Sequence, residues 1–153
     1  MLPTIVEDYQ PNGIDVGSIV RRILSHLSPD LLDGLHEVRL LDQHDKAFAC
    51  YKRNDGIIEI YVTELLGGFS PIWLKMLYPI TYTLIGMALG HELDHHVNRD
   101  NQQIDKEKSA ESHVWKYIYP SLGVFKPAMW VFASLFRAMP RSWQQRIGNM
   151  EKA

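Results

Sequence analysis

An apolar stretch from Tyr78 to Gly90 runs directly into the polar sequence His91-Glu92-Leu93-Asp94-His95. Pro79 suits the first turn of a helix. The apolar character ends after Val97, where a polar run indicates a loop. We therefore predict one long buried helix with two histidines and a glutamate at its solvent end. Its expected core-facing side consists of Ile80, Leu84, Met87 and Leu89.

The spacing of the polar residues, HExxH, is typical of a metal site. His91 and His95 are four residues apart and lie on one helix face, so both imidazoles can bind a single metal ion. Glu92 is offset from that face and can reach a water held by the metal. Zinc lowers the pKa of such a water from about 15.7 to about 7. The motif predicts one zinc ion per chain with Glu92 as the general base, and a solvated surface cluster is the alternative.

A catalytic zinc ion usually has three protein ligands and keeps one position open for water. The third ligand must come from outside HExxH, and the following predicted helix, 104–119, offers Glu107 and Glu111. These two glutamates lie along an otherwise apolar side, where a carboxylate without a partner would be costly. We expect one of them to bind the metal, and ordinary solvation is the alternative. Asp105 and His113 are further candidates.

Length and composition indicate one globular domain, 1–153, because 46% of the residues are hydrophobic and 22% are charged. A net charge of -2 argues against a nucleic-acid-binding protein. The single cysteine, Cys50, excludes an internal disulfide and fits a reducing compartment. Residues 1–10 lack the apolar region of a secretory signal. We expect a cytoplasmic protein.

Two apolar stretches, 65–90 and 128–136, bear on membrane contact. A spanning helix needs about 20 consecutive apolar residues. The first stretch is interrupted by Lys75, prolines and glycines, and the second is too short. We expect both to form buried core helices, with interfacial membrane contact as the alternative.

Local patterns predict an α+β domain in the order helix, β-meander, further helices. Asn54-Asp55-Gly56 predicts a tight hairpin between the last two of three strands. The predicted strands are 35–41, 47–52 and 57–63, and the predicted helices besides 79–97 are 16–27, 72–77, 104–119 and 127–137.

The motif together with Glu107-Lys108-Ser109-Ala110-Glu111 resembles the HExxH plus ExxA[D/N] pattern of gluzincin-type zinc metallopeptidases. The ImmA/IrrE family is the nearest in size and layout, and the resemblance covers roughly residues 57–119. It implies a zincin-like fold that hydrolyses peptide bonds. It also implies that the strand at 57–63 is a sheet edge on which an extended peptide substrate pairs.

The resemblance also implies individual roles. His91, His95 and Glu107 would bind zinc, and Glu92 would be the general base. Glu111 stands where these families have an Asp or Asn that orients a ligand histidine. Asp94 departs from the pattern, because a small residue commonly precedes the second histidine.

Other readings of the chain stay open. In peptide deformylases the motif is also HExDH and a cysteine about 40 residues upstream binds the metal, as Cys50 would here, but the other sequence motifs of that family are absent. A binding or membrane-interacting module with an idle metal site is a second alternative. For a hydrolase, His113, Tyr117 and Tyr119 are candidate oxyanion donors.

Overall fold

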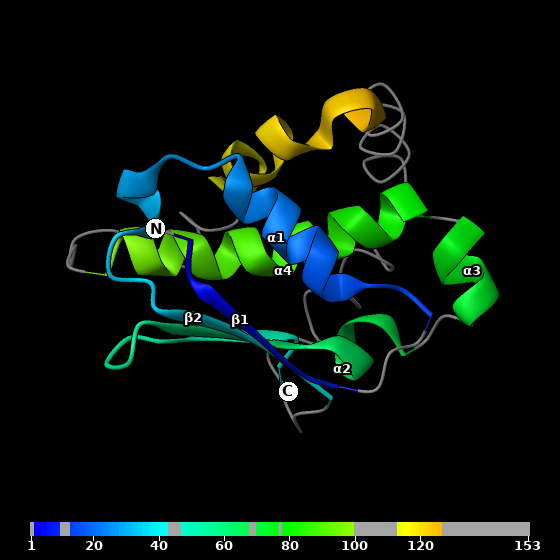
Figure 1. The fold of residues 1–153 in the computed structure, drawn as a ribbon, viewed down its shortest axis with the longest axis horizontal. Helices are drawn as coiled ribbons and strands as arrows, with labels where there is room; N and C mark the ends of the chain where they lie inside the picture. The colour runs from blue at the N-terminus through cyan, green and yellow to red at the C-terminus, as the bar shows by residue number, and fades with distance from the viewer. Residues whose placement is uncertain are drawn as a thin grey trace, which may run out of the picture.

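The computed structural model describes residues 2–9, 13–42, 47–67, 70–76, 78–99 and 113–126. Within these residues, one sheet is covered on one face by helices (Figure 1), which confirms the α+β class. The predicted helix at 127–137 lies outside the described residues. The elements are β1 (Thr4–Asp8), α1 (Val16–Ser25), η1 (Pro29–Leu32), β2 (Glu37–Leu41), β3 (Ala49–Lys52), β4 (Ile57–Tyr61), α2 (Val62–Leu66), α3 (Pro71–Met76), α4 (Tyr78–Val97) and η2 (Tyr119–Phe125).

The four strands are ordered β1-β2-β4-β3. β2 runs parallel to both β1 and β4, whereas β3 is antiparallel to β4. The predicted meander is therefore wrong, because β4 turns back at Gly56 (φ +62°) and inserts between β2 and β3. The expectation that the strand at 57–63 forms the sheet edge is wrong for the same reason. Among the described residues, β1 and β3 are the outer strands of the sheet.

β1 was not predicted from the sequence. It pairs with β2 in parallel, with Thr4 opposite Glu37 and Asp8 opposite Leu41. Parallel neighbours need a crossover connection, and α1 provides it. Its N-cap residue Asp15 accepts a hydrogen bond from the Ser18 backbone N–H, 2.8 Å away, which satisfies one of the open donors of the first turn.

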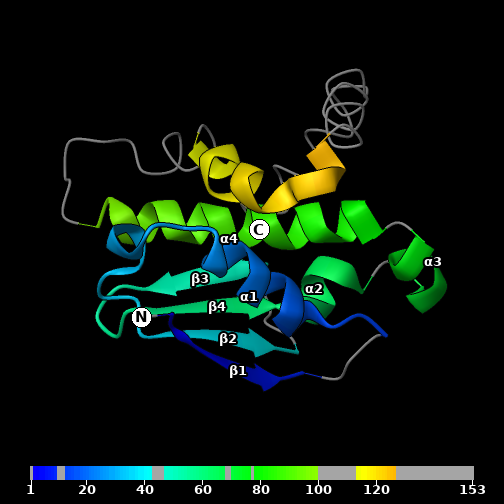
Figure 2. The same ribbon diagram turned by 45° about the horizontal axis from the view of Figure 1, so that its top comes forward.

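Helix α4 forms the middle layer, between the sheet and residues 113–126 (Figure 2). Because both neighbours contact it, its buried face is wider than the single stripe that the sequence predicts. Ile80, Leu84 and Met87 are only half-buried. The fully buried apolar side chains of this layer are Tyr82, Ile85, Leu89 and Leu93, which belong to the same core cluster as Val38, Leu40, Ile58 and Ile60 of the sheet.

On the opposite face of the sheet, Glu59 of β4 is a nearly buried carboxylate, only 4% exposed. It accepts hydrogen bonds from Lys52 Nζ at 2.6 Å and from Tyr61 Oη at 2.7 Å, and Arg39 lies 3.9 Å away. Burial alone would raise the pKa of Glu59, but the hydrogen bonds from Lys52 and Tyr61 outweigh it and lower the pKa. These bonds fix β4 to the edge strand β3.

We expect the Glu59 network to stabilise the protein above the ordinary glutamate pKa of about 4.3 and to lose this effect as the pH falls. The sign follows from the lowered pKa, since below pH 4.3 the unfolded chain binds a proton before the folded one does. Glu59→Gln should cost about 1–2 kcal/mol of unfolding free energy at pH 7, because hydrogen bonds to a charged group weaken. Urea unfolding of the metal-free protein at pH 7 and pH 4 measures the difference in unfolding free energy between wild type and Glu59→Gln.

The difference between wild type and Glu59→Gln should shrink at the lower pH, and a difference independent of pH would contradict this assignment. Asp30→Asn, at an exposed carboxylate of η1, is the matched control.

Candidate metal centre

The two motif histidines lie on successive turns at the C-terminal end of α4, and both are half-buried. Their Nε2 atoms are 3.1 Å apart, and their rings are nearly perpendicular at 83°. Two nitrogens bound to one tetrahedral zinc ion at about 2.0–2.1 Å stand roughly 3.3 Å apart. The spacing and the imidazole chemistry of His91 and His95 therefore fit two ligands of one zinc ion.

Glu92 is only 7% exposed, although it lies in the polar C-terminal part of α4. Burial raises the pKa of the Cys50 thiol, and the negative charge of Glu92 raises it further. The pKa of Tyr61 is raised by burial and by its hydrogen bond to Glu59, with a further contribution from Glu92. The carboxylate thus lies within electrostatic range of β3 and β4. Glu92 is therefore a nearly buried carboxylate whose charge acts on groups of the two strands nearest to α4.

His96 belongs to the scaffold. Its Nδ1 lies 2.9 Å from Tyr51 Oη, and its Nε2 lies 3.0 Å from the Asp33 carbonyl oxygen. The side chain is buried, and this burial lowers the pKa of His96 and favours the neutral ring. The Tyr51 hydroxyl then donates to Nδ1 while Nε2–H donates to Asp33. These bonds hold the last turns of α4 against β3 and the residues after η1.

Asp94 is a site residue whose role the sequence did not reveal. Its side chain is 1% exposed. Tyr117 Oη donates to its Oδ1 at 2.9 Å, and His113 Nδ1 lies 3.3 Å from the same oxygen. Asn98 Nδ2 donates to Oδ2 at 2.9 Å. The only signal in the sequence was a carboxylate at a motif position where a small residue is common.

The three candidate oxyanion donors differ in how far their side chains are exposed. Tyr117 is buried and its hydroxyl donates to Asp94, so it is not presented to a substrate. Burial and this hydrogen bond raise the pKa of Tyr117. Tyr119 is 55% exposed, and Lys126 Nζ lies 4.6 Å from its ring centre. The side chain of His113 is 53% exposed, so His113 and Tyr119 stay accessible.

The predicted third ligands, Glu107 and Glu111, lie outside the described residues. Within the described part of the chain, no three His, Cys, Asp or Glu side chains converge in a way that could hold a metal ion. Cys50 therefore does not join His91 and His95 there. The structure thus gives no support to the deformylase-like ligand set within the described residues.

Two glycines allow residues 113–118 to approach α4 closely. A Cβ atom at Gly90 would stand 3.0 Å from Val114 Cγ2 and 3.1 Å from the Val114 carbonyl oxygen. A Cβ atom at Gly86 would stand 3.1 Å from Ile118 Cγ2. The glycines lie one turn apart on α4, and the second immediately precedes His91. They bring the helical segment 113–118 against the motif.

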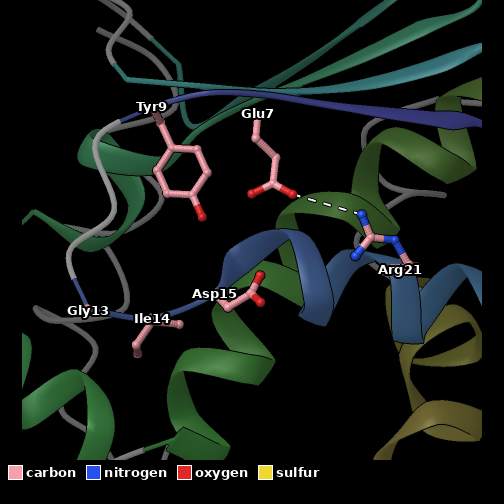
Figure 3. A pocket seen from close by; sticks show the side chains of 6 residues that line it. All are labelled: Glu7, Tyr9, Gly13, Ile14, Asp15 and Arg21. Atoms are coloured by element: carbon pink, nitrogen blue, oxygen red, sulfur yellow. Dashed lines mark ion pairs between the residues drawn. The ribbon is translucent and has the colours of Figure 1, made fainter.

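A hollow of about 310 Å³ lies between β1 and the start of α1, lined by Glu7, Tyr9, Gly13, Ile14, Asp15 and Arg21 (Figure 3). Its polar groups are committed within the fold. Asp15 caps α1, Tyr9 Oη accepts from the Val16 backbone N–H at 3.2 Å, and Glu7 lies 3.9 Å from Arg21. The hollow lies at the β1 edge, and none of its lining residues belongs to the motif.

No helix of the described residues is both long enough and apolar enough to cross a membrane. This covers the described part of the stretch 65–90, whereas 128–136 lies outside. Comparisons of the chain with protein-family models, curated proteins and solved structures find no match.

We expect Gly90→Ala to destabilise the protein although alanine favours helix over glycine by about 1 kcal/mol. The added methyl group meets both the side chain and the backbone of Val114, and overpacking of this kind typically costs about 1–3 kcal/mol. The net loss should therefore be at most about 2 kcal/mol in a urea unfolding experiment. Val114→Ala in the same chain should recover part of it, and a stabilised Gly90→Ala variant would show that the contact is absent.

Proposed function

We propose that this protein is a zinc-dependent peptidase with a zincin-like fold that acts in the cytoplasm. His91, His95 and Glu107 bind one zinc ion, and Glu92 is the general base. The observation that carries the proposal is the 3.1 Å separation of the two Nε2 atoms beside a buried glutamate. Two imidazole nitrogens that converge in this way, with a carboxylate on the same turn, match the donor set of a zinc site with a general base.

When bound, zinc supplies Lewis acidity, which polarises a carbonyl group and lowers the pKa of water. The protein supplies the proton transfers. Glu92 takes a proton from the attacking water and then delivers it to the leaving amine as the C–N bond breaks. Its low exposure keeps bulk water from competing for these transfers. His96, Tyr51 and Asp33 hold the last turns of α4, so that the base and the ligands keep their relative positions.

The substrate is an extended peptide that pairs with β3. This edge strand lies against α4, and it carries Cys50, which lies within electrostatic range of Glu92. Main-chain hydrogen bonds to an edge strand give affinity without requiring particular side chains. A peptide aligned there would bring a backbone carbonyl toward Glu92. β3 thus takes the role that the sequence assigned to the strand at 57–63.

We expect the purified protein to bind about one zinc ion per chain, and His91→Ala and His95→Ala each to abolish stoichiometric binding. Each substitution removes one nitrogen ligand and leaves two protein ligands, whereas a catalytic zinc site usually has three. Metal analysis after dialysis measures the zinc content. Full zinc content in either variant would refute the site.

The two glutamates are distinguished by the size of the loss. Glu107→Ala should reduce zinc affinity more than Glu111→Ala, because loss of a group that only orients a ligand typically costs about 10–100-fold. Competition with a chelator of known affinity measures both variants. The reverse order would make Glu111 the ligand.

Glu92→Gln should retain zinc and the fold but lose about 10²–10⁴-fold in peptide hydrolysis, because the amide cannot accept the proton. The assay is a peptide library read by mass spectrometry, with zinc content and thermal unfolding measured on the same sample. Zinc binding without cleavage by the wild type would favour a binding module. Cleavage at an unchanged rate by Glu92→Gln would exclude this residue as the base.

A further inference from the structure

The helical geometry of the motif gives each of its carboxylates a separate side of α4. With 3.6 residues per turn, Glu92 and Asp94 each lie roughly 80° from the midline between the two histidines, in opposite directions. Glu92 faces β3 and β4, whereas Asp94 faces the helical segment 113–118. In the proposed hydrolysis Glu92 is the general base, and Asp94 has no assigned role.

Burial of Asp94 is costly without donors, because a carboxylate at 1% exposure loses its hydration. Asn98, on the next turn, supplies one donor locally. The two other donors, Tyr117 and His113, come from about 20 residues further along the chain. The carboxylate therefore stabilises one arrangement of the segment 113–118 on α4. This stabilisation adds to that of the apolar contacts at Gly86 and Gly90.

We propose that Asp94 is a positioning residue that sets zinc affinity by fixing the segment 113–118, through Tyr117, beside His91 and His95. The inference rests on the proposed zinc site. In the sequence, the predicted ligands Glu107 and Glu111 stand six and two residues before this segment. A shift of the segment would thus change the delivery of the third ligand while leaving the two histidines in place on α4.

The apolar contacts alone do not provide this control. Packing of Val114 and Ile118 on Gly90 and Gly86 sets how closely the segment approaches α4, but dispersion contacts carry no directional requirement. The 2.9 Å bond from Tyr117 to Asp94 is directional and buried, and it lies on the residue next to His95. It fixes the position of the segment along α4 at the level of the metal ligands.

Two buried tyrosines make a matched test. Tyr117 is 1% exposed and Tyr82 is 0% exposed, and the hydroxyl of each links α4 to the residues at 113–126. Tyr82 Oη donates to the Ser121 carbonyl oxygen at 3.3 Å, three turns before Asp94. Tyr117→Phe and Tyr82→Phe thus remove the same group from the same interface at different distances from the motif.

The experiment measures zinc affinity by chelator competition and thermal unfolding of the metal-free protein for wild type and both variants. Tyr117→Phe should lose about tenfold or more in zinc affinity, as is typical for groups that orient ligands. Tyr82→Phe should keep the wild-type affinity, even where its metal-free form unfolds at a lower temperature. The visible spectrum of the Co²⁺-loaded protein should change in Tyr117→Phe only.

Unchanged zinc affinity in Tyr117→Phe, or equal losses in the two variants, would overturn the positioning role while leaving the zinc site standing. A wild-type protein that binds no zinc would overturn both the site and this inference. Asp94→Asn provides a second variant, since its amide oxygen still accepts from Tyr117. It should keep more zinc affinity than Asp94→Ala, and the reverse order would also overturn the inference.

Discussion

Burial of α4 on two sides is the constraint on which the rest of the structure depends. A helix of 20 residues, about 30 Å long, lies between the sheet and residues 113–126. One side needs branched apolar side chains from β2 and β4, and the other needs glycines so that a second helical segment can approach. The polar C-terminal end of this helix contacts the same two layers, the sheet and residues 113–118. Its carboxylates are therefore both buried, each by a different layer.

The candidate site combines rigid and adjustable parts. Glu92, His91 and His95 lie on one helix, and the bonds of His96 to Tyr51 and Asp33 hold the end of this helix in place. The remaining part depends on a tertiary contact made by Asp94. In the proposed metal centre, α4 places the two histidines, whereas Asp94 links the motif to the segment 113–118.

The sequence predicted what periodicity and turn chemistry encode. The helices at 16–25 and 78–97, the strands β2 to β4 and the turn at Gly56 all follow from local patterns. The insertion of β4 between β2 and β3 did not, because strand order depends on pairing between distant residues that no local pattern records. β1 is short and largely exposed, so its apolar signal is weak. The HExxH residues could be recognised by their spacing. The burial of Asp94 depends on a hydrogen bond from Tyr117, which is 23 residues away in the sequence, and no local pattern indicates such a contact.

The position of β4 in the sheet has a consequence for the order in which the chain assembles. β1 and β2 can pair once residue 41 has been synthesised. The other neighbour of β2 is β4, which follows β3 in the chain. The β3–β4 hairpin is a local pairing, whereas β2 and β4 pair at a longer sequence separation, and such pairing is slower. Asp94 meets its distant donors only after residue 117 has been synthesised. The motif therefore gains the bonds that compensate its buried aspartate only after all four strands of the sheet have been synthesised.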